Sequence, residues 1–337
     1  MTARRTDRPK MAGWEITRRC NLSCPHCYTA ASRGRAPELD APECLRVVDE
    51  LCALGAEMIG WTGGEPLLRD DLEEIAATAR QRGGIRSSVT TNGLLLDERR
   101  ARSLLDAGIS SLQISLDGST AERNRRMRGA SHEEFDRILN AVRIAKRTGF
   151  RLHLAMVLGA ENLDDAPAFL RLARREGVDS VRFCGFVPAG RGKRREIIRR
   201  LGFDGDPVRL REFAETALAA GSPAVLFDPA FGPLPPDYRF HECMAGIQTL
   251  YIASTGDVYP CTSLLNPRFV VGNLRDRSLR DLWDDPKMIA VAGLPRENIA
   301  PGCSGCPEFP GCHGACRGIT FAHTGDLHAA FPVCLHP

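Results

Sequence analysis

Three cysteines within eight residues constrain this chain more than any other feature of its sequence. Cys20, Cys24 and Cys27 have the spacing C-x3-C-x2-C and lie in a short loop after a strand-like segment, residues 13–17. Thiolates this close in sequence can converge on one metal centre, and a [4Fe–4S] cube is usually held by one cysteine sulfur on each iron. Because no fourth ligand is obvious nearby, the pattern predicts a cube with one iron open to another molecule. Such a site is typical of a reaction centre.

A structural zinc site is the first alternative, because zinc also binds cysteines at short spacings. Zinc ligand pairs are commonly C-x2-C, and three cysteines without a matching partner fit that arrangement poorly. Two surface thiols beside one buried thiol are a second alternative. The chain has thirteen cysteines and no secretory signal, which favours metal ligands over disulfides.

Composition excludes a membrane protein and gives little support to nucleic-acid binding. No apolar run approaches the roughly 18 residues of a membrane helix, and residues 2–10 are basic and polar with no apolar stretch after them. We therefore expect a cytoplasmic protein without membrane contact. The net charge is only +3, and the preference for arginine over lysine indicates codon bias rather than a nucleic-acid partner. Two dense basic runs, residues 123–128 and 191–200, are either solvated faces or a contact for an anionic substrate.

Strand-like and helix-like segments alternate over the first two-thirds of the chain. Strands are predicted at residues 13–17, 57–62, 85–91, 110–117, 151–158 and 179–186, with helices at 40–54, 70–82, 97–107, 131–147 and 163–175. Six units at this spacing predict an α/β fold with parallel strands and crossover helices. Periodicity alone does not separate a barrel from an open, doubly wound sheet.

Chemically useful residues follow the carboxyl ends of these strands, where active sites of such folds collect. Gly63, Gly64 and Glu65 end the second strand: the glycines allow close approach of a ligand, and the carboxylate can accept a hydrogen bond from an ammonium group. Residues 115–118 end the fourth strand. For both segments an ordinary loop is the alternative, because Gly-Gly and Asp-Gly pairs are common in loops. Cys184, at the end of the sixth strand, is a candidate substrate contact or hydrogen-atom donor, with simple packing as the alternative.

A second cysteine group occupies the last third of the chain. Its tight part, C-x2-C-x5-C-x3-C, is a strong metal signal, for which a zinc-ribbon-like interaction module is the non-enzymatic alternative. A predicted hairpin at residues 249–261 delivers one more thiolate to the same region. The members are Cys243, Cys261, Cys303, Cys306, Cys312, Cys316 and Cys334.

Together these motifs resemble those of radical S-adenosylmethionine (SAM) enzymes with a SPASM extension. The first cysteine motif is followed by Tyr28, residues 62–66 (TGGEP) resemble the family's GGEP segment, and the C-terminal cysteines match the extension's pattern, including G-x4-C at Gly256 and Cys261. The resemblance covers residues 13–334. It implies a partial (β/α)6 TIM-type barrel with a C-terminal cysteine-rich SPASM extension. It also implies that one electron splits SAM into methionine and a 5′-deoxyadenosyl radical, which takes hydrogen from a substrate held between barrel and extension.

The resemblance also implies residue roles. A [4Fe–4S] cluster that binds SAM would be held by Cys20, Cys24 and Cys27. Contacts to SAM would come from Tyr28, Gly63, Gly64, Glu65, Ser115, Asp117 and Arg128, with Glu65 near its amino group, Ser115 and Asp117 near its ribose and Arg128 on its carboxylate. Two auxiliary [4Fe–4S] clusters are implied, the first on Cys243, Cys261 and Cys316 and the second on Cys303, Cys306, Cys312 and Cys334.

One departure from the family pattern concerns the first auxiliary cluster. Fully ligated relatives have a further cysteine about six residues before Cys243, where this chain has Asp237. The fourth iron is then open, or takes Asp237, water or substrate. Asp237 is therefore, with Cys184, a candidate for a catalytic role, and an open iron would serve substrate binding, electron transfer or sulfur donation. A shifted loop alignment is the simpler explanation.

We divide the chain into a flexible N-terminus (1–12), the barrel core (13–187), a bridge (188–235) and the SPASM domain (236–337). Only 19 residues precede Cys20, which leaves no room there for a leader-peptide module and favours a small-molecule substrate, anionic and nucleotide- or sugar-like. Ribosomal-peptide or sulfatase-type maturation is the alternative, and tetrapyrrole or haem-pathway side-chain modification is another, since residues 183–191 faintly resemble that branch. The expected electron donor is a protein such as flavodoxin or ferredoxin.

Overall fold

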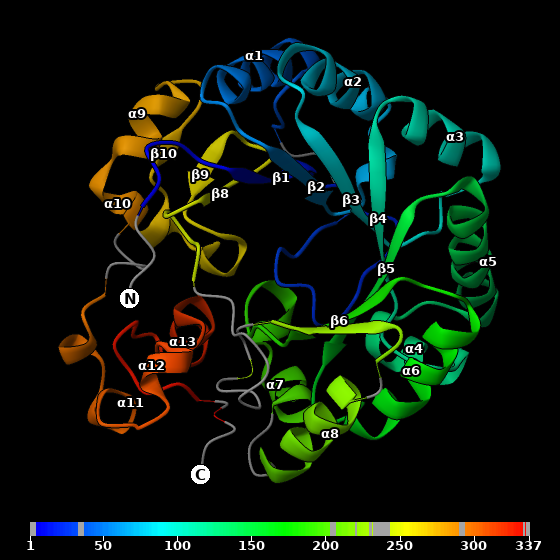
Figure 1. The fold of residues 1–337 in the computed structure, drawn as a ribbon, viewed down its shortest axis with the longest axis vertical. Coiled ribbons are helices and arrows are strands. Elements are labelled where there is room, and N and C mark those ends of the chain that lie inside the picture. Colours follow the sequence, from blue (N-terminus) through cyan, green and yellow to red (C-terminus); the bar gives the residue numbers. More distant parts are fainter. Residues whose placement is uncertain are drawn as a thin grey trace.

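The computed structural model describes residues 5–32, 37–202, 207–219, 221–228, 231, 243–289, 294–332 and 334. In this part of the chain, strands lie side by side in one curved sheet in the order β10-β9-β8-β1-β2-β3-β4-β5-β6-β7 (Figure 1). The strands are β1 (Met11–Thr17), β2 (Met58–Gly63), β3 (Arg86–Thr91), β4 (Ile109–Ser115), β5 (Arg151–Leu158), β6 (Ser180–Gly185), β7 (Ala224–Phe227), β8 (Thr249–Ile252), β9 (Asp257–Tyr259) and β10 (Gly272–Asn273). All neighbours from β8 to β7 are parallel, whereas β8, β9 and β10 are antiparallel.

Helices surround the outside of this sheet and leave a gap that the C-terminal segments fill. In Figure 1, α1, α2, α3, α5 and α6 form an outer arc, and α11 to α13 lie between the two ends of the arc. The helices are α1 (Ala41–Ala53), α2 (Leu72–Gly83), α3 (Glu98–Asp106), α4 (Ala121–Arg128), α5 (His132–Thr148), α6 (Ala166–Arg175), α7 (Arg195–Leu201), α8 (Pro207–Ala219), α9 (Leu279–Asp284), α10 (Pro286–Ile289), α11 (Pro301–Ser304), α12 (Phe309–Cys312) and α13 (Arg317–Thr324).

The predicted α/β partial barrel with its C-terminal extension is confirmed. Six predicted strands are present, and their registers place each parallel to the next. Two capping boxes fix the starts of α1 and α5: Asp40 with Glu43, and Ser131 with Glu134, so these helices begin where local sequence favours them. No helix in the described ranges is both long and apolar enough to cross a bilayer.

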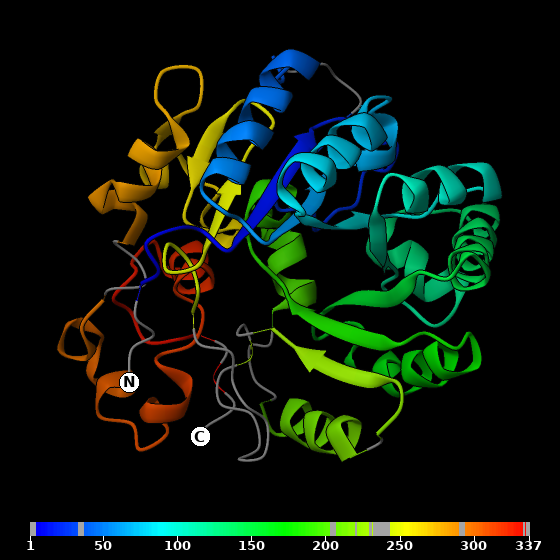
Figure 2. The same ribbon diagram turned by 45° about the horizontal axis from the view of Figure 1, so that its top comes forward.

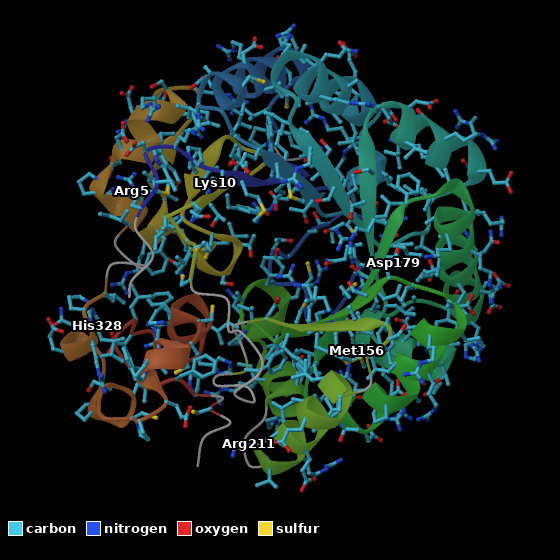
Figure 3. The ribbon with its side chains drawn as sticks, in the orientation of Figure 1. Arg5, Lys10, Met156, Asp179, Arg211 and His328 are labelled. Atoms are coloured by element: carbon cyan, nitrogen blue, oxygen red, sulfur yellow. The ribbon has the colours of Figure 1, made fainter. Side chains whose placement is uncertain are left out.

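The core lies between the sheet and the outer helices. Along β5, alternate residues are buried, because successive side chains of a strand point to opposite faces; Met156 of this strand is fully buried (Figure 3). Trp14 of β1 stacks on Trp61 of β2 with ring centroids 5.3 Å apart. His153, on the opposite face of β5, bonds across strands: its Nε2 lies 3.1 Å from Ser111 Oγ.

Several elements were not predicted. Helix α4 contains the first basic run, and only Asn124 and Met127 of this helix are buried, so its apolar pattern is too sparse to detect. The predicted bridge contributes β7, which pairs with β6. Strand β8 pairs directly with β1 through Met11–Trp14, so the sheet runs without interruption from the barrel core into the extension (Figure 2). The division into four parts stays a prediction; Lys10, assigned to the N-terminus, donates its backbone N–H to Gln248 O at 2.8 Å.

Candidate functional site

The loop after β1 brings the first three cysteines together. Cys20 and Cys24 are buried and Cys27 is half-buried, and all three are free thiols. Cys20 interacts electrostatically with both others, and burial is the main reason why the pKa of its thiol rises to about 11. A thiol in this state binds a metal only when the cation displaces its proton. Three sulfur donors in one loop fit an iron–sulfur cube that has one iron without a protein ligand.

Arg191 holds this loop from the segment that follows β6. Its Nε donates to Cys24 O at 2.9 Å, its Nη1 donates to Ala31 O, and its backbone N–H donates to Cys27 O at 2.9 Å. Gly190 has φ +55°, and a Cβ there would overlap the carbonyl oxygen of Tyr28. The basic run at 191–200 predicts either a solvated face or a contact for an anionic substrate, and it gives no sign of this anchoring role because the partners of Arg191 lie far away in the sequence.

Asp117 is fully buried, and the protein itself occupies both of its carboxylate oxygens. Oδ1 accepts from Val157 N at 2.7 Å, and Oδ2 accepts from Arg128 Nη1 at 2.9 Å. His26 Nε2 lies 3.3 Å from the same Oδ2. Although burial opposes ionisation, Arg128 and His26 outweigh it and hold the pKa of Asp117 down to about 2. The contact with ribose stays a prediction; in the structure Asp117 ties the cysteine loop to α4 and β5.

Arg128 lies beside the cysteines and has unused hydrogen-bonding capacity. The guanidinium interacts electrostatically with Cys24 and Cys20. Its buried Nε has no hydrogen-bond partner in the part of the chain that the structure describes, and neither has the buried Nδ2 of Asn124. Buried donors without partners are rare in native proteins. Arg128 therefore has a donor to offer an anionic group near the loop, in addition to its pair with Asp117.

The Gly63-Gly64-Glu65 segment packs on the cysteine loop more closely than predicted. A Cβ on Gly63 would overlap Thr17 O, and one on Gly64 would overlap Arg19 O; these glycines thus permit close contact between two chain segments. Glu65 is fully buried, and its carboxylate accepts from Thr91 Oγ1 at 2.6 Å and Asn92 N at 2.7 Å. Burial raises its pKa.

The end of β3 also reaches the cysteine loop. Asn92 Nδ2 donates to Asn21 Oδ1 at 2.7 Å, so Glu65, which holds the Asn92 backbone, indirectly positions a residue of the loop. Ser115 is half-buried at the last position of β4. Asn21 was not among the predicted site residues, because a single asparagine in a loop gives no signal in the sequence.

Tyr28 and Cys184 lie where the barrel meets the C-terminal segments. The Tyr28 side chain interacts with that of Thr262, the neighbour of Cys261, and burial raises the pKa of Tyr28. Cys184 also interacts with Tyr28 and with Asp228. The other carboxylate contact of Asp228 is with Arg182, at 2.6 Å. A catalytic role for Cys184 stays a prediction, with packing as its alternative.

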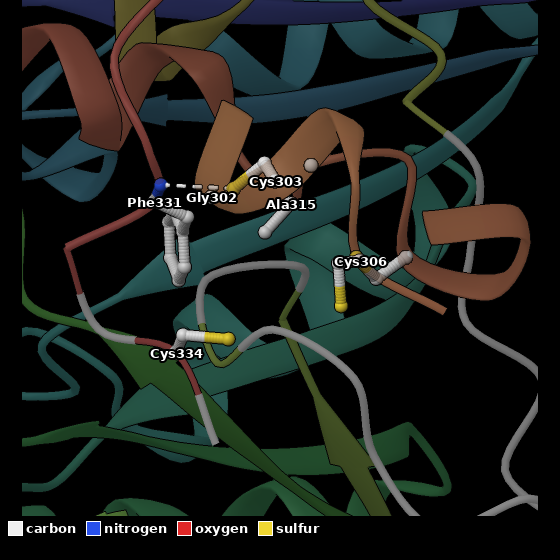
Figure 4. A pocket seen from close by; sticks show the side chains of 8 residues that line it. Gly302, Cys303, Cys306, Ala315, Phe331 and Cys334 are labelled. Atoms are coloured by element: carbon white, nitrogen blue, oxygen red, sulfur yellow. Dashed lines mark hydrogen bonds between the residues drawn. The ribbon is translucent and has the colours of Figure 1, made fainter. Parts of the chain in front are cut away.

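The C-terminal cysteines form two groups. Cys261 interacts electrostatically with Cys316 and Cys243, which brings together the three residues assigned to the first auxiliary cluster. Cys303, Cys306, Cys312 and Cys334 line one cavity (Figure 4), whereas no three acidic, histidine or cysteine side chains in the described ranges are close enough to hold a single metal ion. Asp237 lies outside the described residues.

Comparisons with known proteins agree with this arrangement. Residues 14–173 match the family model described as the radical SAM superfamily, and residues 243–307 match SPASM, an iron–sulfur cluster-binding domain. The chain is 36% identical to an Fe-coproporphyrin III synthase of Methanosarcina barkeri, over 97% of this chain and 88% of that protein. It is 31% identical to a PqqA peptide cyclase of Ruegeria pomeroyi, over 95% and 85%. The fold resembles that of anSMEcpe with bound AdoMet and Cp18Cys peptide, with a TM-score of 0.76, 18% identity and coverage of 96% and 94%.

Proposed function

Because this chain belongs to the radical SAM superfamily and carries a SPASM domain, we propose that Cys20, Cys24 and Cys27 hold its SAM-binding [4Fe–4S] cluster. The radical SAM domain binds such a cluster together with SAM, and the SPASM domain binds auxiliary iron–sulfur clusters. The observation that carries the assignment is the grouping of three free thiols in one anchored loop beside Arg128. When bound, the cluster and SAM supply a 5′-deoxyadenosyl radical for hydrogen abstraction.

The surrounding residues bind and orient SAM in this proposal. Arg128 offers to the SAM carboxylate its Nε, which has no hydrogen-bond partner among the described residues, while Asp117 keeps the guanidinium in place. The backbone of Gly63 and Gly64 presents carbonyl groups to the SAM ammonium, and Glu65 supports that segment from behind. Ser115 at the end of β4 faces the ribose. Tyr28 lies where the barrel meets the C-terminal segments and interacts there with Thr262.

The C-terminal cysteines hold two auxiliary clusters in the same proposal. Cys243, Cys261 and Cys316 supply three ligands to the first, and Cys303, Cys306, Cys312 and Cys334 supply four to the second. Support comes from the electrostatic contacts within the first set and the shared cavity of the second. A three-cysteine site leaves one iron for Asp237, water or substrate.

We favour an anionic small molecule as substrate, and a tetrapyrrole with carboxylate side chains as its first candidate. The relative with 36% identity over nearly the whole chain is named a Fe-coproporphyrin III synthase, and residues 188–191 (PAGR) lie in the segment that resembles the haem-pathway branch. Peptide maturation is the second candidate, because a PqqA peptide cyclase is 31% identical.

The cluster assignment is tested with a triple variant, Cys20→Ala, Cys24→Ala and Cys27→Ala. After anaerobic reconstitution we expect iron to fall from about twelve to about eight atoms per chain, and reductive SAM cleavage to disappear. The matched control is Cys52→Ala, which removes a half-buried thiol of α1 and should keep both iron and activity. Cleavage of SAM by the triple variant would refute the assignment.

The substrate is tested by release of 5′-deoxyadenosine. We expect an iron tetrapyrrole with propionate side chains to raise the rate above that of uncoupled SAM cleavage, with matching loss of substrate by mass spectrometry. Stimulation by a precursor peptide, and none by the tetrapyrrole, would favour the second candidate.

A further inference from the structure

Helices α4 and α7 form one strongly basic surface, which we call the α4–α7 arginine face and define as residues 122–126 and 193–200. Residues 191–200 contain six basic side chains and one acidic one, although the whole chain has a net charge of only +3. Most of the face is exposed. The concentration of charge is therefore local and lies mainly at the protein surface.

The two helices are packed together and do not form separate patches. Met127 of α4 shares an apolar cluster with Phe186 and with Ile197 and Leu201 of α7. The Arg200 guanidinium crosses between the helices and donates to Arg126 O at 3.0 Å. Residues 125–126 and 199–200 therefore adjoin one another.

Both halves of this face rest on the cysteine loop. His26 Nδ1 bonds to Met127 O at 2.9 Å, so α4 contacts the loop between Cys24 and Cys27. Arg191, immediately before the α7 half, contacts the carbonyl groups of those same two cysteines. The segments that carry the basic surface are thus anchored directly on the cysteine loop.

Part of the basic charge is balanced within the protein. Arg123, Arg126, Arg194 and Arg200 form ion pairs with Asp164, Glu122, Glu196 and Glu161, respectively. Arg125, Lys193, Arg195 and Arg199 are exposed and form no ion pair with any residue that the structure describes. Four positive charges on this face are therefore available to an external partner.

We propose that the α4–α7 arginine face docks an acidic electron-carrier protein of the flavodoxin or ferredoxin class. This inference rests on the proposed function, which requires one electron per SAM cleaved. The reduced carrier gives up that electron and is oxidised by one electron, and the centre held by the cysteine loop is reduced by one. Complementary charge accelerates such encounters by steering, and docking directly over the loop keeps the electron-transfer path short.

The face is tested by reversing three of these four charges, with Arg125→Glu, Arg195→Glu and Arg199→Glu combined. The control combines Arg99→Glu, Arg102→Glu and Arg171→Glu on α3 and α6, which are also exposed and belong to the outer arc of helices (Figure 1). Both variants change the net charge equally, so that an effect of overall charge is separated from an effect of this face. A milder set, with the same three face arginines replaced by glutamine, guards against misfolding.

Two measurements use a purified flavodoxin as the probe. The first is its dissociation constant for each variant by fluorescence anisotropy, and the second is stopped-flow reduction of the reconstituted enzyme by the flavodoxin hydroquinone. At low ionic strength we expect the charge-reversed face to bind and accept electrons at least about tenfold more weakly than wild type. The glutamine variant should have an intermediate affinity and an intermediate rate of reduction, and added salt should reduce the difference between wild type and the charge-reversed variant.

SAM cleavage driven by dithionite distinguishes failure of the docking proposal from failure of the proposed function. Dithionite needs no docking surface, so the face variant should cleave SAM at the wild-type rate. Equal flavodoxin kinetics in face and control variants would overturn the docking proposal and leave the function intact. Tighter binding of a labelled RNA oligonucleotide than of flavodoxin, through the same arginines, would also overturn it. Absence of cleavage by wild-type protein with dithionite would count against the proposed function itself.

Discussion

Replacing Asp117 with asparagine removes the negative charge that balances Arg128 and changes little else. The amide oxygen can still accept from Val157 N, but the amide group would face a buried guanidinium that stays charged. Removing one partner of a buried ion pair costs about 3–5 kcal/mol, because the other charge is left uncompensated. We therefore expect Asp117→Asn to be severely destabilised.

Urea unfolding of the reconstituted protein under anaerobic conditions measures this loss. With an m-value of about 3 kcal/mol/M, the midpoint should fall by about 1 M or more. Asp164→Asn is the matched control, since it breaks the Asp164–Arg123 pair, in which both side chains are at least one-third exposed. That pair should contribute less than about 1 kcal/mol, so the control midpoint should shift by less than about 0.3 M.

A loss of SAM affinity without a loss of stability would contradict this reasoning. If Asp117 acted mainly on the ribose, the asparagine variant would keep the wild-type midpoint and would bind SAM more weakly. A midpoint equal to that of the Asp164→Asn control would refute the argument that the buried pair with Arg128 organises the loop.

Two further predictions concern the contact of Gly190 with the cysteine loop and the ion pair between Glu43 and Arg275. Gly190→Ala should reduce SAM cleavage by at least about tenfold and lower the iron content, because a Cβ overlaps Tyr28 O. The control is Gly129→Ala, also in left-handed conformation but with open space around it, which should cost only about 1–2 kcal/mol in unfolding free energy. Equal SAM cleavage and equal iron content in the two variants would contradict the steric reasoning. The hydrogen bonds from Arg275 lower the pKa of Glu43 to about 2. The stabilisation that the Glu43–Arg275 pair gives to the folded protein is therefore fully present above pH 4.5 and is lost as the pH falls toward 2. Glu43→Gln should lower the unfolding free energy by about 1 kcal/mol at pH 6 and much less at pH 2.5, and a difference that does not shrink with acid would speak against the pair.

Local sequence patterns predicted most of the scaffold. The strand–helix alternation predicted the parallel sheet, and two predicted helices begin at capping boxes that the structure shows at Asp40 and Ser131. These features depend on interactions between residues that are close in sequence. Cysteine spacing predicted which thiols belong to the first loop for the same reason. The grouping of Cys316 with Cys261 came from family resemblance and stays a prediction, although the two thiols are near enough to interact electrostatically.

Long-range hydrogen bonds explain what the sequence could not predict. Val157 reaches Asp117 across 40 positions, and Arg191 reaches Cys24 across 167. Nothing in the local pattern of Asp117 distinguishes a carboxylate that contacts a ligand from one that neutralises a buried arginine. Helix α4 was missed because its residues carry charge at nearly every exposed position, which hides the weak apolar stripe of Met127.

The pairing of β8 with β1 has a consequence for how this protein can be engineered. Because β1 lies between β2 and β8, a fragment that stops before residue 243 would expose a bare strand edge, and such edges recruit other chains. Transplanting the C-terminal part onto a different barrel would require a recipient first strand of matching register. Chimeras should therefore keep β1 and β8 from the same parent protein.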